Sequence, residues 1–177
     1  MLEETISKEF LYKGKIFQVE LHKIKTQSGN EGKREIVRHP GSVVILPVDS
    51  HDNVYLARQF RKPVEKALLE LPAGKLEEGE SPEICAKREL QEELNFEAKN
   101  WLYLTSVYTS PGFTDEKMYF FVCENLKPAY GEQEDDENIE VEKLNLKELW
   151  EKIKKGEIED GKTILAVSLY KSIKNNL

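Results

Sequence analysis

The chain has 177 residues, of which 39% are hydrophobic and 9% aromatic, so we expect one domain with an adequate core and a small N-terminal addition. The formal net charge of −7 argues against sequence-independent binding to nucleic acid and against binding to an anionic membrane. No apolar run approaches the length of a membrane span, about 18 residues, and the acidic N-terminus is not typical of a signal peptide. We therefore expect a cytoplasmic protein. The two cysteines, Cys85 and Cys123, lack metal-binding spacing, so we expect reduced, buried thiols and no zinc site.

The N-terminal part of the chain predicts a small antiparallel β-sheet. Phe17 and Leu21 belong to a segment in which apolar and polar residues alternate, which is typical of a β-strand. A turn-rich segment follows and an extended segment resumes after it, so residues 15–38 predict a hairpin. A Pro-Gly pair then interrupts the pattern. We therefore expect an N-terminal β annex at residues 1–40.

The main domain, residues 41–177, alternates predicted strands with predicted helices. Its first segment is a continuous apolar run, short enough for a buried strand. Strands interspersed with helices indicate a mixed β-sheet with helices on both faces, which is an α/β/α sandwich. The expected strands are residues 42–48, 54–60, 68–71, 101–109, 117–123 and 139–144, and the expected helices are residues 82–94, 147–155 and 161–174.

The helix at residues 82–94 carries clear start signals. Ser81 can cap its N-terminus, Pro82 suits the first helical position, and Glu83 complements the positive end of the helix dipole. Asn95 follows the helix and is the residue other than glycine best suited to a left-handed helix end. An apolar stripe along the helix indicates that it packs on the core.

Three carboxylates lie on one face of this helix, because Glu89, Glu92 and Glu93 stand at positions i, i+3 and i+4. Like charges at this spacing repel, and a hard divalent cation would relieve the repulsion. Mg²⁺ binds carboxylate oxygens and often shares a substrate phosphate. An acidic face is also common on solvated surface helices, so the wider pattern must decide between the two interpretations.

That wider pattern resembles the Nudix box, G-x5-E-x7-R-E-U-x-E-E-x-G-U, where U is a bulky aliphatic residue. Gly74 is followed after five residues by Glu80, and seven more residues lead to Arg88-Glu89. The pair Glu92-Glu93 and then Phe96 complete the match, with Asn95 in place of the late glycine. The resemblance to the Nudix family implies the same α/β/α sandwich.

Features on both sides of the box resemble the ADP-ribose pyrophosphatase branch of this family. They are the runs at residues 34–37, 39–41, 58–63, 70–74 and 110–116, with Pro111 fifteen residues past the box. In that branch a proline at about this place marks ADP-ribose specificity, although Pro-Gly is also an ordinary β-turn. The resemblance implies hydrolysis of ADP-ribose to AMP and ribose 5-phosphate with Mg²⁺, or with Mn²⁺ in its place.

The resemblance also implies roles for individual residues. Glu89, Glu92 and Glu93 would hold the metal ions with the backbone carbonyl of Ala73, and Glu92 and Glu93 count among the catalytic residues. Metal ions can clamp the diphosphate oxygens and activate the attacking water. A structural ion pair is expected between Glu80 and Arg88.

The substrate and the general base are assigned on the same ground. Arg61 would neutralise the diphosphate and Arg34 would approach the substrate from the annex, since arginine pairs bidentately with phosphate oxygens. Pro111 would bind the substrate, Glu116 would contact its adenosine side, and Phe17 or Tyr12 would stack on adenine. The general base is expected in the acidic loop after residue 131, with Glu137 favoured and Glu134 and Asp135 left open.

Three further expectations concern partners and alternatives. The resemblance implies a homodimer in which the N-terminal sheet is exchanged, so that each site borrows residues from its partner. A different nucleoside-diphosphate-linked substrate, such as a sugar nucleotide or a dinucleotide, remains open, because the box handles the diphosphate and not the groups attached to it. A non-catalytic sensor that binds ADP-ribose is the third alternative.

Overall fold

The computed structural model describes residues 2–131 and 138–174, and the chain divides into two compact units. The N-terminal unit combines residues 1–42 with residues 106–118, and the main unit contains residues 43–105 and 119–177. The boundary expected at residue 40 thus leaves out one segment of the N-terminal unit. That segment is joined to the unit through Val37, whose N–H donates to the Phe113 carbonyl at 2.8 Å. No local pattern in the sequence marks a pairing over such a distance along the chain.

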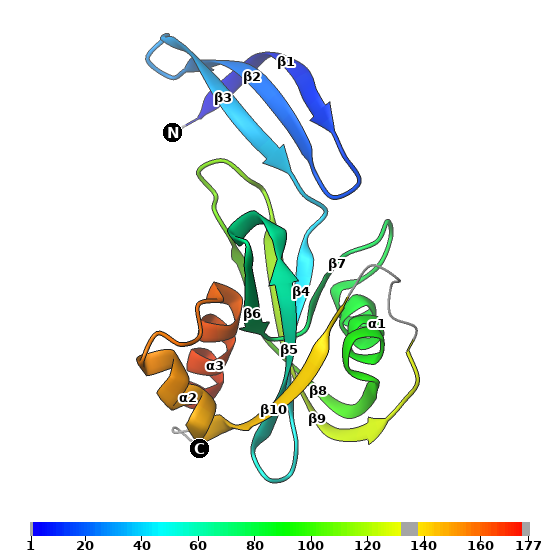
Figure 1. The fold of residues 1–177 in the computed structure, drawn as a ribbon. Helices are drawn as coiled ribbons and strands as arrows, with labels where there is room; N and C mark the ends of the chain where they lie inside the picture. The colour runs from blue at the N-terminus through cyan, green and yellow to red at the C-terminus, as the bar shows by residue number, and fades with distance from the viewer. Residues whose placement is uncertain (1, 132–137, 175–177) are drawn as a thin grey trace. The chain divides into compact units, whose positions relative to one another are not determined.

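The N-terminal unit contains a three-stranded antiparallel sheet in the order β1-β2-β3 (Figure 1). Its strands are β1 (Glu3–Lys13), β2 (Gln18–Thr26) and β3 (Glu31–Arg38). The predicted hairpin is confirmed as the β2–β3 pair. The side chains of β1 are exposed along its whole length, whereas β2 buries alternate residues. One face of β2 is therefore packed within this unit, and β1 forms an exposed edge.

The main unit is built on a seven-stranded sheet in which β10-β5-β4-β9-β8 form a continuous path, with β6 paired to β5 and β7 to β4. The strands are β4 (Ser42–Val48), β5 (Asn53–Arg61), β6 (Lys66–Glu70), β7 (Ala73–Lys75), β8 (Phe96–Tyr108), β9 (Lys117–Pro128) and β10 (Glu140–Asn145). A short 3-10 turn, Lys62–Val64, joins β5 to β6. The helices are α1 (Pro82–Leu94), α2 (Leu146–Lys154) and α3 (Gly161–Lys174).

Helices cover both faces of this sheet, with α1 on one side and α2 and α3 on the other (Figure 1). The central strand β4 is buried at every position. Because side chains alternate along a strand, Val43 and Ile45 face α1 and pack with Leu90 in one core cluster. The predicted α/β/α sandwich with a mixed sheet and a small N-terminal antiparallel sheet is therefore confirmed.

The helix predicted at residues 82–94 is confirmed with the same bounds as α1. The Ser81 hydroxyl accepts a hydrogen bond from the Ile84 N–H at 3.4 Å, as expected of an N-cap. Asn95 ends the helix in the left-handed conformation, with φ 55° and ψ 41°. Its side-chain oxygen also accepts from the Gly131 N–H at 3.1 Å, a contact that a glycine at this position would lack.

The observed strands differ from the predicted ones at several places, of which two flank α1. The short strand β7 was not predicted, because Ala73–Lys75 shows no apolar alternation. Strand β8 begins at Phe96, five residues before the predicted start, through a polar segment whose side chains are largely exposed. An edge strand tolerates such residues because one of its sides pairs with no other strand, so polarity does not exclude a strand there.

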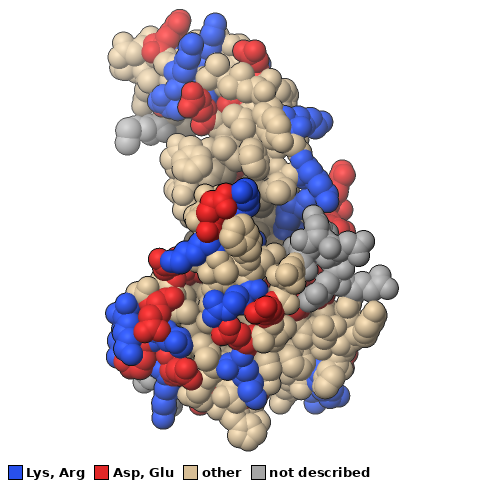
Figure 2. All heavy atoms as spheres, in the orientation of Figure 1, with Lys and Arg blue, Asp and Glu red and all other residues tan. Residues whose placement is uncertain are grey.

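The surface shown in Figure 2 carries acidic and basic side chains intermixed, including over the region of α2 and α3. Ion pairs join acidic and basic side chains of α2, for example Lys154 with Glu151 at 2.7 Å. Within residues 2–131 and 138–174, no helix is both long enough and apolar enough to cross a membrane.

Candidate functional site

The box region, which we define as β7, the following loop and α1, brings two carboxylates against the backbone of β7. The Glu89 carboxylate lies against Gly74, where a Cβ atom would come within 1.8 Å of the Glu89 carboxyl carbon. The Ala73 N–H donates to the Glu93 carboxylate at 3.3 Å. Only glycine at position 74 leaves room for this arrangement, which explains why the box pattern begins with that residue.

Arg88 connects the acidic residues of the box. Its Nε and Nη2 atoms donate to the two oxygens of Glu80, each at 3.0 Å, so the predicted ion pair is present. Its Nη1 atom donates to Glu89 at 2.7 Å and to Glu92 at 2.8 Å. These carboxylates raise the pKa of Arg88, and the hydrogen bonds from Arg88 hold the pKa of Glu80 below its ordinary value. Arg88 therefore binds the expected metal ligands as well as Glu80, which the sequence did not predict.

The donor set of the box region fits a hard cation. Glu89 and Glu93 are buried and Glu92 is partly exposed, so three carboxylates are concentrated on one side of α1 with a single arginine between them. Carboxylate oxygens are the ligands that Mg²⁺ prefers. Within the described ranges, no three His, Cys, Asp or Glu side chains are already gathered in a metal-binding arrangement.

Arg61 forms the second part of the candidate site, at the end of β5. Its Nε and Nη2 atoms donate to the two oxygens of Glu70 at 2.9 and 2.8 Å, a bidentate pair. The side chain of Glu70 is only 2% exposed, whereas that of Arg61 is 40% exposed. Among the described residues, the remaining Nη1 atom of Arg61 has no hydrogen-bond partner. Glu70 raises the pKa of Arg61 most strongly, and the charge of Glu93 adds to this effect. Arg61 binds Glu70, and Ala73, three residues further along the chain, binds Glu93, so Arg61 lies near the acidic face of α1.

Glu70 and its second cationic partner, Lys162, were missed by the sequence analysis. Glu70 stands in the run 70–74 that resembles the family, yet nothing in the sequence shows that its carboxylate is buried. Lys162 lies in the first turn of α3 and reads as one of many surface lysines. The burial of Glu70 requires charge compensation, and only the tertiary contacts show which cations supply it.

The expected substrate residues of the N-terminal unit have local partners. Arg34 donates to the carboxylate of Glu3 and, through Nη1, to the Lys33 carbonyl at 2.9 Å. Phe17 is partly exposed and its ring centroid lies 5.8 Å from that of Tyr12. Both expected stacking residues thus lie in one aromatic pair.

Pro111 and Glu116 lie on the loop between β8 and β9. Pro111 is in a turn in which the Ser110 carbonyl accepts from the Phe113 N–H at 3.0 Å. The two oxygens of Glu116 accept from the hydroxyls of Ser42 at 3.1 Å and Thr109 at 3.0 Å. Glu116 therefore stabilises the base of this loop, a structural contact that the sequence did not predict.

The expected general bases, Glu137 with Glu134 and Asp135 as alternatives, lie outside the described residues. Of the expected site residues, the structure brings together Ala73, Glu89, Glu92, Glu93 and Arg61 in the main unit. Arg34, Phe17, Pro111 and Glu116 belong to the N-terminal unit.

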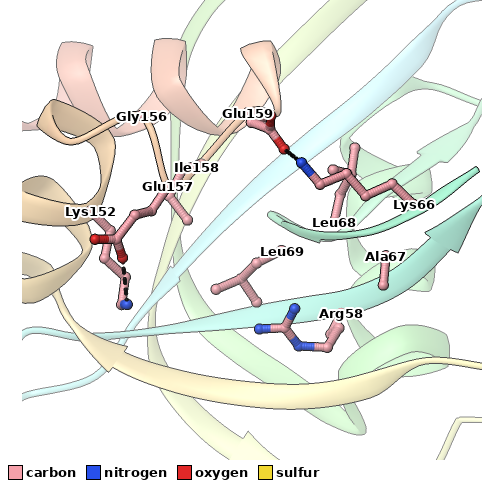
Figure 3. A pocket seen from close by; sticks show the side chains of 10 residues that line it. All are labelled: Arg58, Lys66, Ala67, Leu68, Leu69, Lys152, Gly156, Glu157, Ile158 and Glu159. Atoms are coloured by element: carbon pink, nitrogen blue, oxygen red, sulfur yellow. Dashed lines mark hydrogen bonds and ion pairs between the residues drawn. The ribbon is translucent and has the colours of Figure 1, made fainter. Parts of the chain in front are cut away.

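A separate cavity of about 370 Å³ lies between the β5–β6 hairpin and the segment that joins α2 to α3 (Figure 3). Two lysines that line the cavity form ion pairs with glutamates that also line it, Lys66 with Glu159 and Lys152 with Glu157. No residue of the box region lines it. The lining residues are Arg58, Lys66, Ala67, Leu68, Leu69, Lys152, Gly156, Glu157, Ile158 and Glu159.

Comparison with protein families gives a match between the NUDIX domain model and residues 37–167, well over half of the chain. The chain is 40% identical over 167 residues to the ADP-ribose pyrophosphatase of Bacillus subtilis (strain 168), covering 93% of this chain and 90% of that protein. Over the same length and with the same coverage, it is 38% identical to the methanol dehydrogenase activator of Bacillus methanolicus.

A solved structure also matches. The crystal structure of an ADP compounds hydrolase superposes with a TM-score of 0.88 and covers 99% of this chain and 96% of that chain. The sequence identity is 21%, so this likeness establishes the fold.

Proposed function

The chain belongs to the NUDIX family, and we propose that it is a hydrolase that cleaves the diphosphate bond of ADP-ribose to give AMP and ribose 5-phosphate. The observation that carries this proposal is the placement of two buried carboxylates, Glu89 and Glu93, against β7 with Arg61 nearby. In such a site the carboxylates could bind a metal cation, and the arginine could bind the anionic diphosphate of a substrate. The substrate itself is proposed from the similarity to the Bacillus subtilis ADP-ribose pyrophosphatase.

Mg²⁺, or Mn²⁺ in its place, is the proposed cofactor. Glu89, Glu92, Glu93 and the carbonyl of Ala73 would hold it, since hard oxygen ligands suit these ions. Bound there, the metal would neutralise the diphosphate and lower the pKa of a water molecule. Arg88 keeps Glu89 and Glu92 in place, and its hydrogen bonds to Glu80 fix its own position.

The protein's own residues would contribute orientation and proton transfer. Arg61 would bind a diphosphate oxygen through Nη1, because its other nitrogens are engaged by Glu70. We propose Glu137 as the general base that takes the proton of the attacking water, with Glu134 and Asp135 as alternatives. A base on a loop after the core strands suits closure over a bound substrate.

The N-terminal unit is proposed to complete the site in a homodimer with exchanged N-terminal sheets. Strand β1 is exposed throughout and carries Ile6, Phe10, Leu11 and Tyr12 at the surface, which is unusual for a strand that stays in water. In this arrangement Arg34, Phe17, Pro111 and Glu116 would contact the substrate. Light scattering is expected to give a particle of twice the 20.5 kDa chain mass, and a monomer at all concentrations would contradict the dimer. A cytoplasmic location is proposed with it, since Cys85 and Cys123 are free thiols.

The experiment that tests the function is Mg²⁺-dependent turnover of ADP-ribose, compared with GDP-mannose, NADH and diadenosine polyphosphates. Release of AMP and ribose 5-phosphate from ADP-ribose at the highest kcat/KM, abolished in Glu93→Gln, is the expected result. Preference for another compound would keep the site chemistry and replace the substrate. Tight binding of ADP-ribose without turnover of any compound would favour the sensor instead.

A second candidate function follows from the relative named as a methanol dehydrogenase activator, which is almost as similar as the pyrophosphatase. The same site would then serve to activate a partner dehydrogenase. Assay of a methanol dehydrogenase with and without this protein separates the two candidates. Activation lost together with hydrolysis in Glu93→Gln would support both functions from one site.

A further inference from the structure

Arg61 is held by a carboxylate that is itself fixed from a distant part of the chain. Glu70, at the end of β6, accepts a bidentate pair of hydrogen bonds from Arg61. Its Oε2 atom also accepts from the Nζ atom of Lys162, in the first turn of α3. The Lys162 side chain is only 10% exposed, so this contact is shielded from water on both sides. Interactions between charges are stronger in such a shielded setting than on an open surface.

The start of α3 is fixed to the same place by a second set of contacts. Asp160 accepts from the Thr163 N–H at 3.0 Å and from the Thr163 hydroxyl at 2.5 Å. The Thr163 hydroxyl in turn accepts from the Leu71 N–H at 2.7 Å. Asp160 also pairs with Lys162 at 3.0 Å. The first turn of α3 thus contacts both Glu70 and the residue that follows it.

The contacts balance in charge, since Arg61 and Lys162 are positive and Glu70 and Asp160 are negative. With Arg61 alone, the bidentate pair could shift as a unit and the cost of burying the carboxylate would be less fully offset, whereas a second cation from another direction fixes the position of Glu70. The orientation of Glu70 decides where the guanidinium plane of Arg61 lies. It therefore decides where Nη1 points, the Arg61 nitrogen that has no hydrogen-bond partner among the described residues.

We propose that Lys162 and Glu70 are positioning residues that aim Arg61 at the diphosphate of the substrate. The inference rests on the proposed hydrolysis of a nucleoside diphosphate derivative. Neither residue touches the substrate; Lys162 acts on Glu70, and Glu70 acts on Arg61. The N-terminus of α3 is in this way part of substrate recognition, although it contributes no ligand.

The test is a double-mutant cycle on KM for ADP-ribose with Lys162→Met and Arg61→Met. Lys162→Met is expected to raise KM about tenfold with kcat within about threefold, because the diphosphate charge is present in the bound substrate as well as in the transition state. In the Arg61→Met background, the same change is expected to have almost no further effect, because the residue through which it acts is gone. KM does not depend on the fraction of folded enzyme, so partial unfolding does not imitate this result.

Two further variants serve as controls. Lys162→Arg keeps the charge and the hydrogen-bond donors and is expected to restore KM to within about threefold of the wild type. Lys152→Met removes the same charge from a lysine that pairs with Glu157 at 3.0 Å and has no contact with Arg61. It is expected to leave KM unchanged.

The outcomes separate the two proposals. Suppose that the wild type hydrolyses ADP-ribose and that the effects of Lys162→Met and Arg61→Met on KM multiply in the double variant. This result would overturn the positioning role and leave the proposed function intact. An equal rise of KM in Lys152→Met would also overturn it, because net charge would then be the cause. A wild type that turns over no diphosphate compound would overturn the proposed function, and the inference with it.

Discussion

Two arginines of the main unit, Arg88 and Arg61, show how one kind of contact serves two purposes. In the box region, Arg88 engages all three of its nitrogens, and every partner lies between Lys75 and Glu92. Arg61 binds a single carboxylate, and the residues that fix this carboxylate come from α3, some 90 residues away along the chain. Both arginines bind buried or partly buried carboxylates in bidentate pairs.

The two arginines differ in the hydrogen-bond donors that remain available to a ligand. Arg88 is 26% exposed and saturated, so it can only hold its neighbours in place. Within residues 2–131 and 138–174, Arg61 has one nitrogen without a hydrogen-bond partner, and it is more exposed than Arg88, so it can receive an anionic ligand and keep its pair with Glu70. The local contacts of Arg88 therefore fix the carboxylates proposed as metal ligands, while Arg61, held from a distant part of the chain, has a charge available for the proposed substrate.

The largest effect is expected from Glu93→Gln, which removes a charge from the acidic face without changing the shape of the side chain. Loss of one group that stabilises charge in the transition state costs at least about 10²-fold in kcat. Initial rates at saturating Mg²⁺ measure this loss, which contrasts with the KM effect expected near Arg61. Glu83→Gln is the matched control, since Glu83 is an exposed glutamate of the same helix that pairs with Lys87 at 2.7 Å. Equal rates in Glu93→Gln and wild type would remove Glu93 from the proposed metal site.

The next largest effect is expected from Gly74→Ala. The new Cβ atom would occupy the position of the Glu89 carboxylate, 1.8 Å from its carbon, so the carboxylate must move. A displacement of about 1 Å at a catalytic group can cost about 10²-fold in rate, and kcat should fall by this order. Gly161→Ala is the control, because no atom lies within 4 Å of the added Cβ there. A Gly74→Ala enzyme with normal kcat would contradict the tight contact with Glu89.

A moderate effect on stability is expected from Arg88→Met. The substitution leaves Glu80, Glu89 and Glu92 without their shared cation, at a cost of about 2 kcal/mol after allowance for partial exposure. Urea unfolding without metal measures it. Lys87→Met breaks an exposed pair on the same helix and should cost no more than about 0.5 kcal/mol. Similar losses in the two variants would mean that Arg88 is not a structural centre of the box region.

The smallest effect is expected in the pH dependence of stability. Hydrogen bonds from Arg88 lower the pKa of Glu80 in the folded state from 4.5, so the unfolded state binds more protons between the two pKa values. The stabilisation by Glu80 is therefore complete above 4.5 and is lost as the pH falls through the lowered pKa. Glu80→Gln should flatten the fall of unfolding free energy between about pH 5 and pH 3. If the unfolding free energies of Glu80→Gln and the wild type fell equally with decreasing pH, the direction of this pKa shift would be contradicted.

Much of the fold could be predicted because its signals are local. The bounds of α1 follow from Ser81, Pro82 and Asn95, and the buried strand β4 follows from an uninterrupted apolar run. The ion pair of Glu80 with Arg88 could be predicted because both residues stand in one spaced motif. In contrast, β7 is too short for periodicity, and its role depends on the carboxylates that α1 brings against it.

The sequence by itself determined the order of the strands and helices of the main unit apart from β7, the acidic face of α1 and the family to which these residues point. Each of these depends on residues close together in the chain, where spacing alone places side chains on a common face. Only the tertiary structure decided that Glu70 is buried, that Lys162 completes its charge balance and that, among the residues described, one nitrogen of Arg61 has no hydrogen-bond partner. Burial results from packing between distant segments. The desolvation cost of a buried charge, which is offset only by oppositely charged partners, therefore cannot be recognised from neighbouring residues in the sequence.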